Sequence, residues 1–366
     1  MAKKLRIGIL FGGKSAEHEI SLLSAKNVVA ALDPNKYEVV LVGIDKNGEW
    51  HLRDAEKFLL NAENPRLVQL NKSMANVALV PKENGLPLVS LSGNPLNEPL
   101  DVVFPILHGT YGEDGTVQGL LKLSNVPFVG AGVLGSAIGM DKDVMKRLLR
   151  DAKINTAKFL TFHTAKIDYD HVVKKLGLPF FIKPANLGSS VGISKVKDRT
   201  QFQEAVDLAF SYDRKILIEE FIEGKEIECS ILGNEHPIVS LPGEAIPLVH
   251  EFYSYEAKYY ENGVDFKFPA DLDKKTIGKI QKMAVKAYKV LCCEGMARVD
   301  MFLKANGKVY VNELNTIPGF TSTSAFPKLW AASGVSYTEI LDKLIALALE
   351  RHEKERALKV HYTPKI

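Results

Sequence analysis

The sequence is poor in cysteine, with only Cys229, Cys292 and Cys293 among 366 residues. The count is odd, two of the three are adjacent, and no CxxC pair occurs, so neither a disulfide framework nor a cysteine-based zinc site is indicated. We expect reduced, buried thiols, which are typical of a cytoplasmic protein.

Long apolar runs and concentrated charge are also missing. No apolar stretch reaches the roughly 20 residues that span a bilayer, which excludes a membrane partner. The 47 Lys and Arg residues nearly balance 44 Asp and Glu, giving a net charge of +3. Because the basic residues are dispersed, nothing indicates a nucleic-acid partner. The apolar start is closed by Gly12-Gly13 without a cleavage site, so it is interpreted as a first strand rather than a signal peptide.

Three common catalytic or nucleotide-binding motifs are absent or incomplete. The absence of GxxxxGK[ST] excludes a P-loop enzyme. His18-Glu19 begins an HExxH motif, but Leu22 occupies the position of the second histidine. Residues 130–135 fit GxGxxG, yet the following strand, Ala157–Phe162, ends in His163-Thr164 rather than in the carboxylate that binds a ribose. A dinucleotide site is therefore rejected.

What is present predicts an α/β and α+β protein of several domains, because 366 residues exceed one compact core. Residues 1–139 are expected to form a doubly wound parallel sheet, and residues 140–222 and 223–366 two α+β domains. The segment from residue 47 to 98 carries no readable motif. The expected strands are Leu5–Leu10, Val39–Ile44, Asp101–Leu107, Val126–Val129, Ala157–Phe162, Phe180–Lys183, Gly192–Val196, Lys215–Glu220, Ile227–Leu232, Ile238–Leu241, Met296–Leu303 and Lys308–Leu314. The expected helices are Ser21–Leu32, Asp141–Arg150, Thr200–Phe210, Thr276–Leu291 and Tyr337–Arg351.

A hairpin over the last two strands predicts a cluster of oxygen ligands. Asn306-Gly307 is typical of a two-residue turn, which would place Asp300 opposite Glu313 and Arg298 opposite Asn315 on one face. Facing carboxylates repel each other, and Mg²⁺ bound by such oxygens would relieve the repulsion. The alternative is a solvated face on which Arg298 neutralises Asp300.

A second feature is Lys183, which ends a strand just before the small residues Gly188, Ser189, Ser190 and Gly192. Such a loop can fold over an anion and cradle phosphates with its amides and hydroxyls, and a preceding lysine favours this reading over a flexible turn. A third feature, the strand end from Glu219 to Glu226, is acidic. Taken alone, it is better explained as a surface turn.

Together these residues resemble the ATP-grasp fold, and specifically the D-alanine–D-alanine ligase family, over nearly the whole chain from about Ile7 to Ser324. The quoted segments that carry the resemblance are Gly12–Ser21, His108-Gly109, Gly112–Gly115, Met140–Lys142, Lys183–Gly192, Tyr255–Tyr259, Arg298–Asp300 and Glu313–Thr316. One departure is Phe221, which stands where many relatives have tryptophan.

The resemblance implies roles at an ATP site. Lys142, Lys183 and the loop containing Gly188 and Ser190 would hold the phosphates. Glu219 and Glu220 would lie at the base, with Glu219 accepting from the adenine amino group. Ile222 would offer a backbone contact and Glu226 would bind the ribose. Two Mg²⁺ ions, with Mn²⁺ as an alternative, would be held by Asp300, Glu313 and Asn315.

The resemblance also implies the reaction: two D-alanine molecules joined through a D-alanyl phosphate, for peptidoglycan precursor synthesis in the cytoplasm. Glu17 and His108 would bind the first D-alanine, Ser324 the second, and Arg298 with the Gly319 amide the oxyanion. The loop from residue 243 to 265, with Lys258 near the phosphates and Tyr259 linked with Ser189 to Glu17, would be a lid. A homodimer is implied. D-lactate or D-serine as second substrate, other amino acids, and a regulatory module without turnover remain alternatives.

Overall fold

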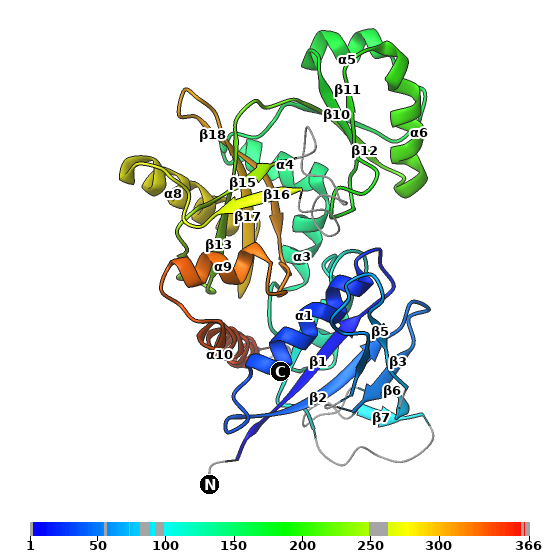
Figure 1. Cartoon of the computed structure of the whole chain (residues 1–366), viewed down its shortest axis with the longest axis vertical. Helices are drawn as coiled ribbons and strands as arrows, with labels where there is room; N and C mark the ends of the chain where they lie inside the picture. Colours follow the sequence, from blue (N-terminus) through cyan, green and yellow to red (C-terminus); the bar gives the residue numbers. More distant parts are fainter. Residues whose placement is uncertain are drawn as a thin grey trace.

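The computed structural model describes residues 3–54, 57–72, 74–80, 88–91, 99–248, 263–359 and 362. These residues form three parts in chain order, each built on its own sheet (Figure 1). Within the described ranges, no helix is long and apolar enough to cross a membrane.

The first sheet has the strand order β7-β6-β3-β2-β1-β8. Its strands are β1 (Leu5–Gly12), β2 (Tyr37–Ile44), β3 (Trp50–Arg53), β6 (Ala75–Leu79), β7 (Leu88–Ser90) and β8 (Val102–Ile106). The predicted parallel pairing is confirmed for β1 with β2 and β8. The segment that carried no motif adds the antiparallel strands β3, β6 and β7, and a separate pair, β4 (Leu59–Leu60) with β5 (Gln69–Leu70). The strand expected over residues 126–129 contributes only the bridge Val103–Phe128.

Helices cover both faces of this sheet, as a doubly wound arrangement requires. Ile7 and Ile9 of β1 pack in a core shared with α1 (His18–Ala31) and α10 (Tyr337–Arg356). Leu10 points to the other face, where α2 (Thr116–Leu123) packs. The last helix of the chain thus returns to the first sheet, although it follows the third sheet in sequence.

The second sheet is antiparallel, with strand order β11-β10-β12-β9. Its strands are β9 (Phe159–Phe162), β10 (Phe180–Pro184), β11 (Ser194–Val196) and β12 (Ile216–Glu220). Phe180, Ile182 and Ile218 pack under α5 (Tyr169–Leu176) and α6 (Phe202–Tyr212), which follows a short 3₁₀ turn, η1 (Arg199–Gln201). Strand alternation therefore directs Lys183 and Glu219 to the opposite face.

The third sheet has the order β16-β15-β13-β17-β18, with β14 on β13. Its strands are β13 (Lys225–Leu232), β14 (Ile238–Val239), β15 (Gly243–Pro247), β16 (Val264–Lys267), β17 (Met296–Leu303) and β18 (Val309–Asn315). One face packs with α3 (Val133–Met140), α4 (Lys142–Asp151) and α8 (Lys274–Val290), and α9 (Ala325–Ala332) follows β18.

Several predictions need correction. The expected loop from residue 243 to 265 begins in β15 and ends in β16, because these segments pair with each other. Its residues 249–262 lie outside the described ranges. Cys229 and Cys293 are free and buried as expected, but Cys292 is exposed after the end of α8. The helices α2, α3, α5 and α9 were not predicted; each has only eight residues, about two turns, which gives an apolar pattern little length in which to repeat.

The GxGxxG-like segment serves helix packing. A Cβ on Gly135 of α3 would lie 2.6 Å from the Cys292 carbonyl oxygen, so glycine there allows close approach of two backbones. This packing accounts for the glycine without a dinucleotide.

Candidate active site

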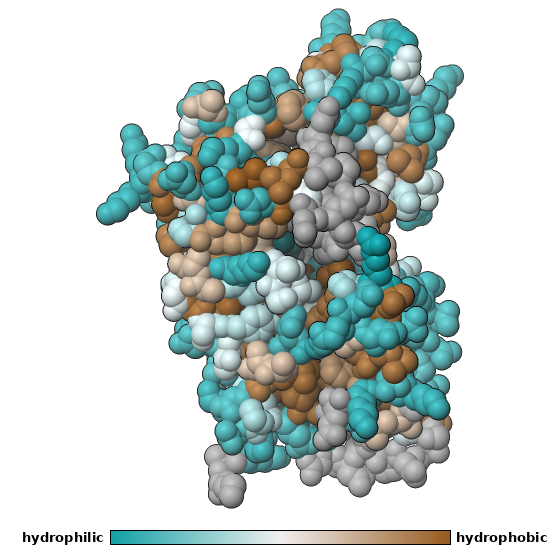
Figure 2. Space-filling model, viewed as in Figure 1, coloured by the Kyte–Doolittle hydropathy of each residue, from teal (hydrophilic) through white to brown (hydrophobic). Residues whose placement is uncertain are grey.

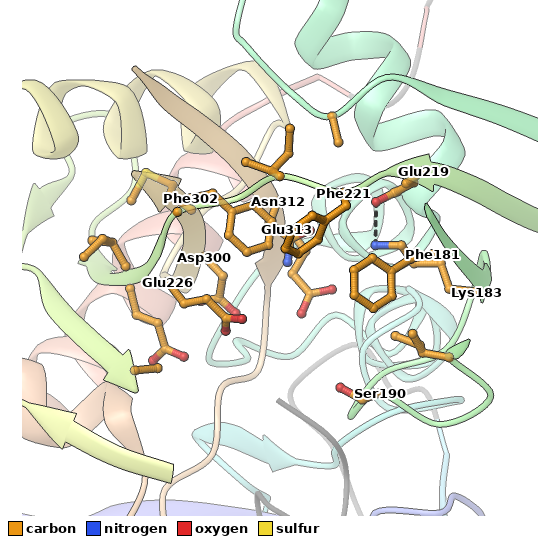
Figure 3. Close-up of a pocket in the computed structure, with 18 of the residues that line it drawn as sticks. Phe181, Lys183, Ser190, Glu219, Phe221, Glu226, Asp300, Phe302, Asn312 and Glu313 are labelled. Atoms are coloured by element: carbon orange, nitrogen blue, oxygen red, sulfur yellow. Dashed lines mark ion pairs between the residues drawn. The ribbon is translucent and has the colours of Figure 1, made fainter. Parts of the chain in front are cut away.

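A cavity of about 400 Å³ lies between the second and third sheets. The second sheet contributes the face opposite α5 and α6 and the third sheet the face opposite α8, and α4 and the loop after β10 complete the wall. Carboxylates of Glu226, Asp300 and Glu313 point into it from one side, and Lys183 and Ser190 lie on the other (Figure 3). On the face seen in Figure 2, hydrophobic residues gather over β15 and β16, whereas hydrophilic residues cover the outer end of α8.

The β17–β18 hairpin reaches the predicted register by an unexpected route. Arg298 pairs with Asn315 and Asp300 with Glu313, as expected, and Val299, Met301, Leu303 and Leu314 take the buried face. The turn, however, has three residues, Ala305 to Gly307, since the Lys304 amide donates to the Lys308 carbonyl at 2.9 Å. A β-bulge at Asn312 compensates for the extra residue.

The bulge decides which side chains reach the cavity. With a three-residue turn and no bulge, Asp300 would face Asn312, and the Glu313 side chain would point toward the core. With the bulge, both Asn312 and Glu313 line the cavity on the side of Asp300. The two carboxylates therefore share one face because of a local irregularity and not because of an ideal turn.

Asp300 is the centre of a polar network. Arg298 donates from Nε and Nη2 to its two oxygens at 2.7 Å each, and the Asn315 amide donates to Oδ2 at 2.9 Å. Arg298 Nε also lies 3.4 Å from Oε2 of Glu228, the cross-strand neighbour of Asp300. Arg298 thus neutralises Asp300, as the alternative reading of the hairpin expected, and Glu313 lies on the same face.

The donor set fits a divalent cation. Asp300, Glu313 and Asn315 present carboxylate and amide oxygens on one face of a hairpin, the type of ligand Mg²⁺ prefers. Glu313 Oε2 lies 3.5 Å from the ammonium group of Lys142, one of the two lysines predicted to bind phosphates. The predicted metal ligands and the predicted phosphate-binding groups are therefore neighbours.

Glu219 connects two lysines on the far side of the cavity. Its carboxylate is buried and lies 2.7 Å from Nζ of Lys183 and 3.2 Å from Nζ of Lys146. Burial alone would raise the pKa of Glu219, but the two ammonium groups hold it below its usual range. Among the described residues, Glu219 Oε1 accepts no well-directed hydrogen bond, and Lys146 reaches it at ion-pair distance only.

The loop after β10 closes against Lys142. The Lys142 ammonium donates to the Leu187 carbonyl at 2.8 Å. Ser189 and Ser190 both have left-handed backbones, with φ of 50° and 61°, a conformation that costs energy for residues other than glycine. Both serines and Gly188 line the cavity beside Lys142 and Lys183, so the predicted phosphate-binding groups are brought together.

Several residues of the acidic segment from Glu219 to Glu226 line the cavity. Glu219, Glu220, Ile222 and Glu226 line it, and the Glu220 carboxylate also accepts from the Lys158 amide at 2.9 Å. Phe221 is 38% exposed and its ring centre lies 6.1 Å from that of Phe181, which gives the cavity an aromatic edge.

Glu17 lies where the first domain meets the glycine-rich loop. It accepts a hydrogen bond from Ser189, as the resemblance implied. A Cβ on Gly109 or on Gly188 would lie 2.7 or 3.0 Å from its Oε2, so both glycines make room for this carboxylate. The Ser15 hydroxyl accepts from the Glu17 amide at 2.9 Å and fixes its backbone.

His108, predicted to bind the first D-alanine, is held by contacts inside the protein. It is buried, and its ring nitrogens lie 3.0 Å from the Ile317 carbonyl and 3.0 Å from the Ser24 hydroxyl. With both nitrogens engaged inside the protein, the imidazole holds the segment leading to Gly319, and its contact with the first D-alanine stays a prediction. Burial would lower the pKa of His108, but Glu113, 3.8 Å away, raises it. Burial in turn raises the pKa of Glu113 to about 7.

Two of the residues predicted to act on the second D-alanine and the oxyanion, Gly319 and Ser324, lie next to each other. Gly319 lies against Ser324, whose Oγ would be 2.7 Å from a Cβ at that position. The Ser324 hydroxyl accepts from the Thr321 amide at 3.0 Å. Neither residue is among those that line the cavity. Lys258 and Tyr259 lie outside the described residues.

Sequence reasoning missed two buried charges near the cavity. Lys146 lies one turn after Lys142 on the buried face of α4, and this i, i+4 spacing was the available signal. Glu228 alternates with Glu226 on β13, but nothing in its local sequence indicated that it would face Asp300.

Two α+β domains close on one cavity, with Lys183 on one side and the carboxylates of Asp300 and Glu313 on the other. This arrangement defines an enzyme of the ATP-grasp class. The family models described as D-ala D-ala ligase N-terminus and D-ala D-ala ligase C-terminus match residues 6–131 and 148–346. The chain belongs to the D-alanine–D-alanine ligase family.

Individual relatives agree with this assignment. The chain is 54% identical over 363 residues to the D-alanine–D-alanine ligase of Shouchella clausii, covering 98% of each chain. It is similar to the solved D-alanine-D-alanine ligase from Coxiella burnetii, with a TM-score of 0.83, 39% identity and 97% of each chain covered. It is also similar to the VanG D-Ala:D-Ser ligase from Enterococcus faecalis, with a TM-score of 0.80, 36% identity, and coverage of 94% of this chain and 100% of that one.

Proposed function

We propose that this protein joins two D-alanine molecules at the expense of ATP and releases D-alanyl-D-alanine, ADP and phosphate. The observation that carries the proposal is the cavity in which Lys142, Lys183 and the glycine-rich loop stand opposite Asp300 and Glu313. A carboxylate must be activated before an amine can displace its oxygen, and this arrangement suits the transfer of a phosphoryl group to it.

The nucleotide would lie along the cavity. Its phosphates would be bound by Lys142, Lys183 and Ser190, and Glu226 would accept from the ribose hydroxyls. Glu219 would accept from the adenine amino group, because this residue lines the cavity wall. The Ile222 backbone would contact the base edge, and the aromatic edge of Phe181 and Phe221 would contact its face.

Asp300, Glu313 and Asn315 would hold two Mg²⁺ ions, or Mn²⁺. When bound, the metal offsets negative charge on the phosphate chain. Arg298 would then lose Asp300 as its main partner, and its guanidinium would turn to the reacting carboxyl group with Glu228 as the remaining counter-ion.

The amino acids would bind on the side of the first domain. Glu17 would pair with the ammonium of the first D-alanine, held in place by Ser189. The carboxylate of this first D-alanine attacks the γ-phosphorus of ATP, ADP leaves, and a D-alanyl phosphate forms. The amine of the second D-alanine attacks the carbonyl carbon, the oxyanion accepts from Arg298 and the Gly319 amide, and phosphate leaves. Ser324 would hold the second carboxylate, and Lys258 and Tyr259, by resemblance, would shield the intermediate.

The test is ADP release with purified protein, ATP and Mg²⁺, with and without D-alanine. We expect release that requires D-alanine and yields the dipeptide. Parallel reactions that contain D-alanine together with D-serine or D-lactate test these compounds as the second substrate. If D-alanyl-D-serine or D-alanyl-D-lactate is the main product, the protein is the corresponding ligase and the proposal is wrong. ADP release independent of any D-amino acid would contradict it.

The biological setting is part of the same proposal. The dipeptide would supply peptidoglycan precursor synthesis in the cytoplasm, and the enzyme would act as a homodimer. Sedimentation at several protein concentrations would test the dimer.

A further inference from the structure

Lys146 is a fully buried lysine that the proposed reaction does not use. It projects from α4 with 0% exposure, and its Nζ lies 3.2 Å from Glu219 Oε1 and 3.0 Å from the Thr156 hydroxyl. Burial lowers the pKa of Lys146, and the Glu219 carboxylate opposes that effect. A buried lysine is costly unless it is paired, so a specific arrangement keeps it here.

Glu219 stands between two cations of different accessibility. Lys183, 2.7 Å from Oε2, lines the cavity and can turn toward a ligand (Figure 3). Lys146, on the Oε1 side, is not among the lining residues and is held by Thr156. One cation is therefore free to move and the other is fixed.

The charges explain why both cations are needed. When Lys183 turns to the phosphates of a nucleotide, Glu219 loses its nearest partner. Removing one member of a buried ion pair is strongly unfavourable, because it leaves a charge without compensation. With Lys146 fixed behind it, Glu219 keeps a counter-ion and remains an ionised acceptor.

We infer that Lys146 is a positioning residue for nucleotide recognition: it holds Glu219 toward the 6-amino group of the base and lets Lys183 leave for the phosphates. The inference rests on the proposed placement of ATP. It assigns part of the base selectivity to a side chain that does not touch the nucleotide.

The test compares the binding of two nucleotides by calorimetry, ATP and purine riboside triphosphate, which carries hydrogen in place of the 6-amino group. We expect the unaltered protein to prefer ATP. In Lys146→Met, ATP affinity should fall at least about tenfold and the preference for ATP should shrink. A purely structural role would weaken both nucleotides equally, and an unchanged ratio would overturn the inference.

A double-mutant cycle tests whether Lys146 acts through Glu219. In Glu219→Gln there is no carboxylate to hold, so adding Lys146→Met should leave the ratio unchanged. An equal loss of preference in both backgrounds would contradict the inference. Lys146→Gln, which keeps a donor but no charge, answers the same question if the Met variant does not fold.

Lys215→Met is the matched control. Lys215 is a partly buried lysine near α4, but it pairs with Asp141 and, at 3.5 Å, with Asp143 rather than with Glu219. Its removal is expected to lower the melting temperature without changing the nucleotide ratio. Because nucleotide binding is measured without turnover, the binding result can be interpreted even if the protein does not catalyse the proposed ligation. If the unaltered protein does not bind ATP, both proposals fall.

Discussion

The Ser189 hydroxyl donates a hydrogen bond to the Glu17 carboxylate and joins the loop after β10 to the start of α1. The two residues follow strands of different sheets, β1 and β10, and are separated by 172 positions in sequence. The contact couples the loop proposed to bind phosphates to the carboxylate proposed to bind the first amino acid.

Ser189→Ala is expected to lower kcat/KM for D-alanine about 10- to 100-fold, because a hydrogen bond to a charged group contributes roughly 1.5–3 kcal/mol. Steady-state kinetics with D-alanine varied at saturating ATP measure the effect. Ser211→Ala, which removes an exposed hydroxyl of α6 bonded to the Leu208 carbonyl, is the control. Equal kinetics for the two variants would mean that the link to Glu17 carries no function.

Glu313→Gln is expected to reduce turnover about 1000-fold or more while the fold persists. It removes one charge from the metal ligands, and metal stabilisation of phosphoryl transfer amounts to several kcal/mol. It also removes repulsion with Asp300, so the melting temperature should change by only a few degrees. Activity over a range of Mg²⁺ concentrations and thermal melting are the measurements. Near-normal activity at low Mg²⁺ would refute the ligand assignment, and Glu223→Gln, at an exposed position, is the control.

Glu113→Gln is expected to alter the pH dependence of stability. Burial raises the pKa of Glu113 to about 7 in the folded protein, above the ordinary value of 4.5 for a glutamate side chain. Between these values the folded state binds more protons than the unfolded chain, so stability falls as the pH rises through this window. The stability of the wild-type protein minus that of the variant should therefore decrease from pH 5 to pH 7.5, by at most about 3 kcal/mol. Urea unfolding at several pH values measures the difference, and a constant or increasing difference would be contrary to the assignment.

The sequence predicted that Asp300 and Glu313 face each other, but through an argument that was only half right. Asn306-Gly307 indicated a two-residue turn, whereas the turn contains Ala305 as well. The bulge at Asn312 restored the register at Asp300 and Glu313. Bulges depend on packing across the sheet, which local sequence does not encode, so the agreement at the site depended on two offsets that cancel.

Residues whose roles come from long-range contacts were beyond sequence reasoning. His108 sits in a recognisable motif, but only the fold shows that Ile317 and Ser24 occupy its ring nitrogens. The ion pairs of Lys146 with Glu219 and of Arg298 with Glu228 join separate elements. By contrast, Lys183 and the glycine-rich loop are contiguous in sequence, and for that reason their shared site could be predicted.

Gly319→Ala is expected to separate the two halves of the proposed reaction. A Cβ at this position would lie 2.7 Å from the Ser324 hydroxyl, so the serine or the backbone that carries the Gly319 amide must shift. Displacements near 1 Å at such sites cost up to about 100-fold in rate. The first D-alanine and the nucleotide bind elsewhere, so D-alanyl phosphate should still form. Hydroxylamine, a small nucleophile without a carboxylate, would trap that intermediate as the hydroxamate. We therefore expect dipeptide synthesis to fall about 10- to 100-fold and hydroxamate formation to fall less, because hydroxylamine needs the oxyanion contact but not the carboxylate contact of Ser324. Gly119→Ala, in α2 with open space around the new Cβ, controls for the added methyl group. If both products fall together in Gly319→Ala, Gly319 and Ser324 do not form a separate site for the second substrate.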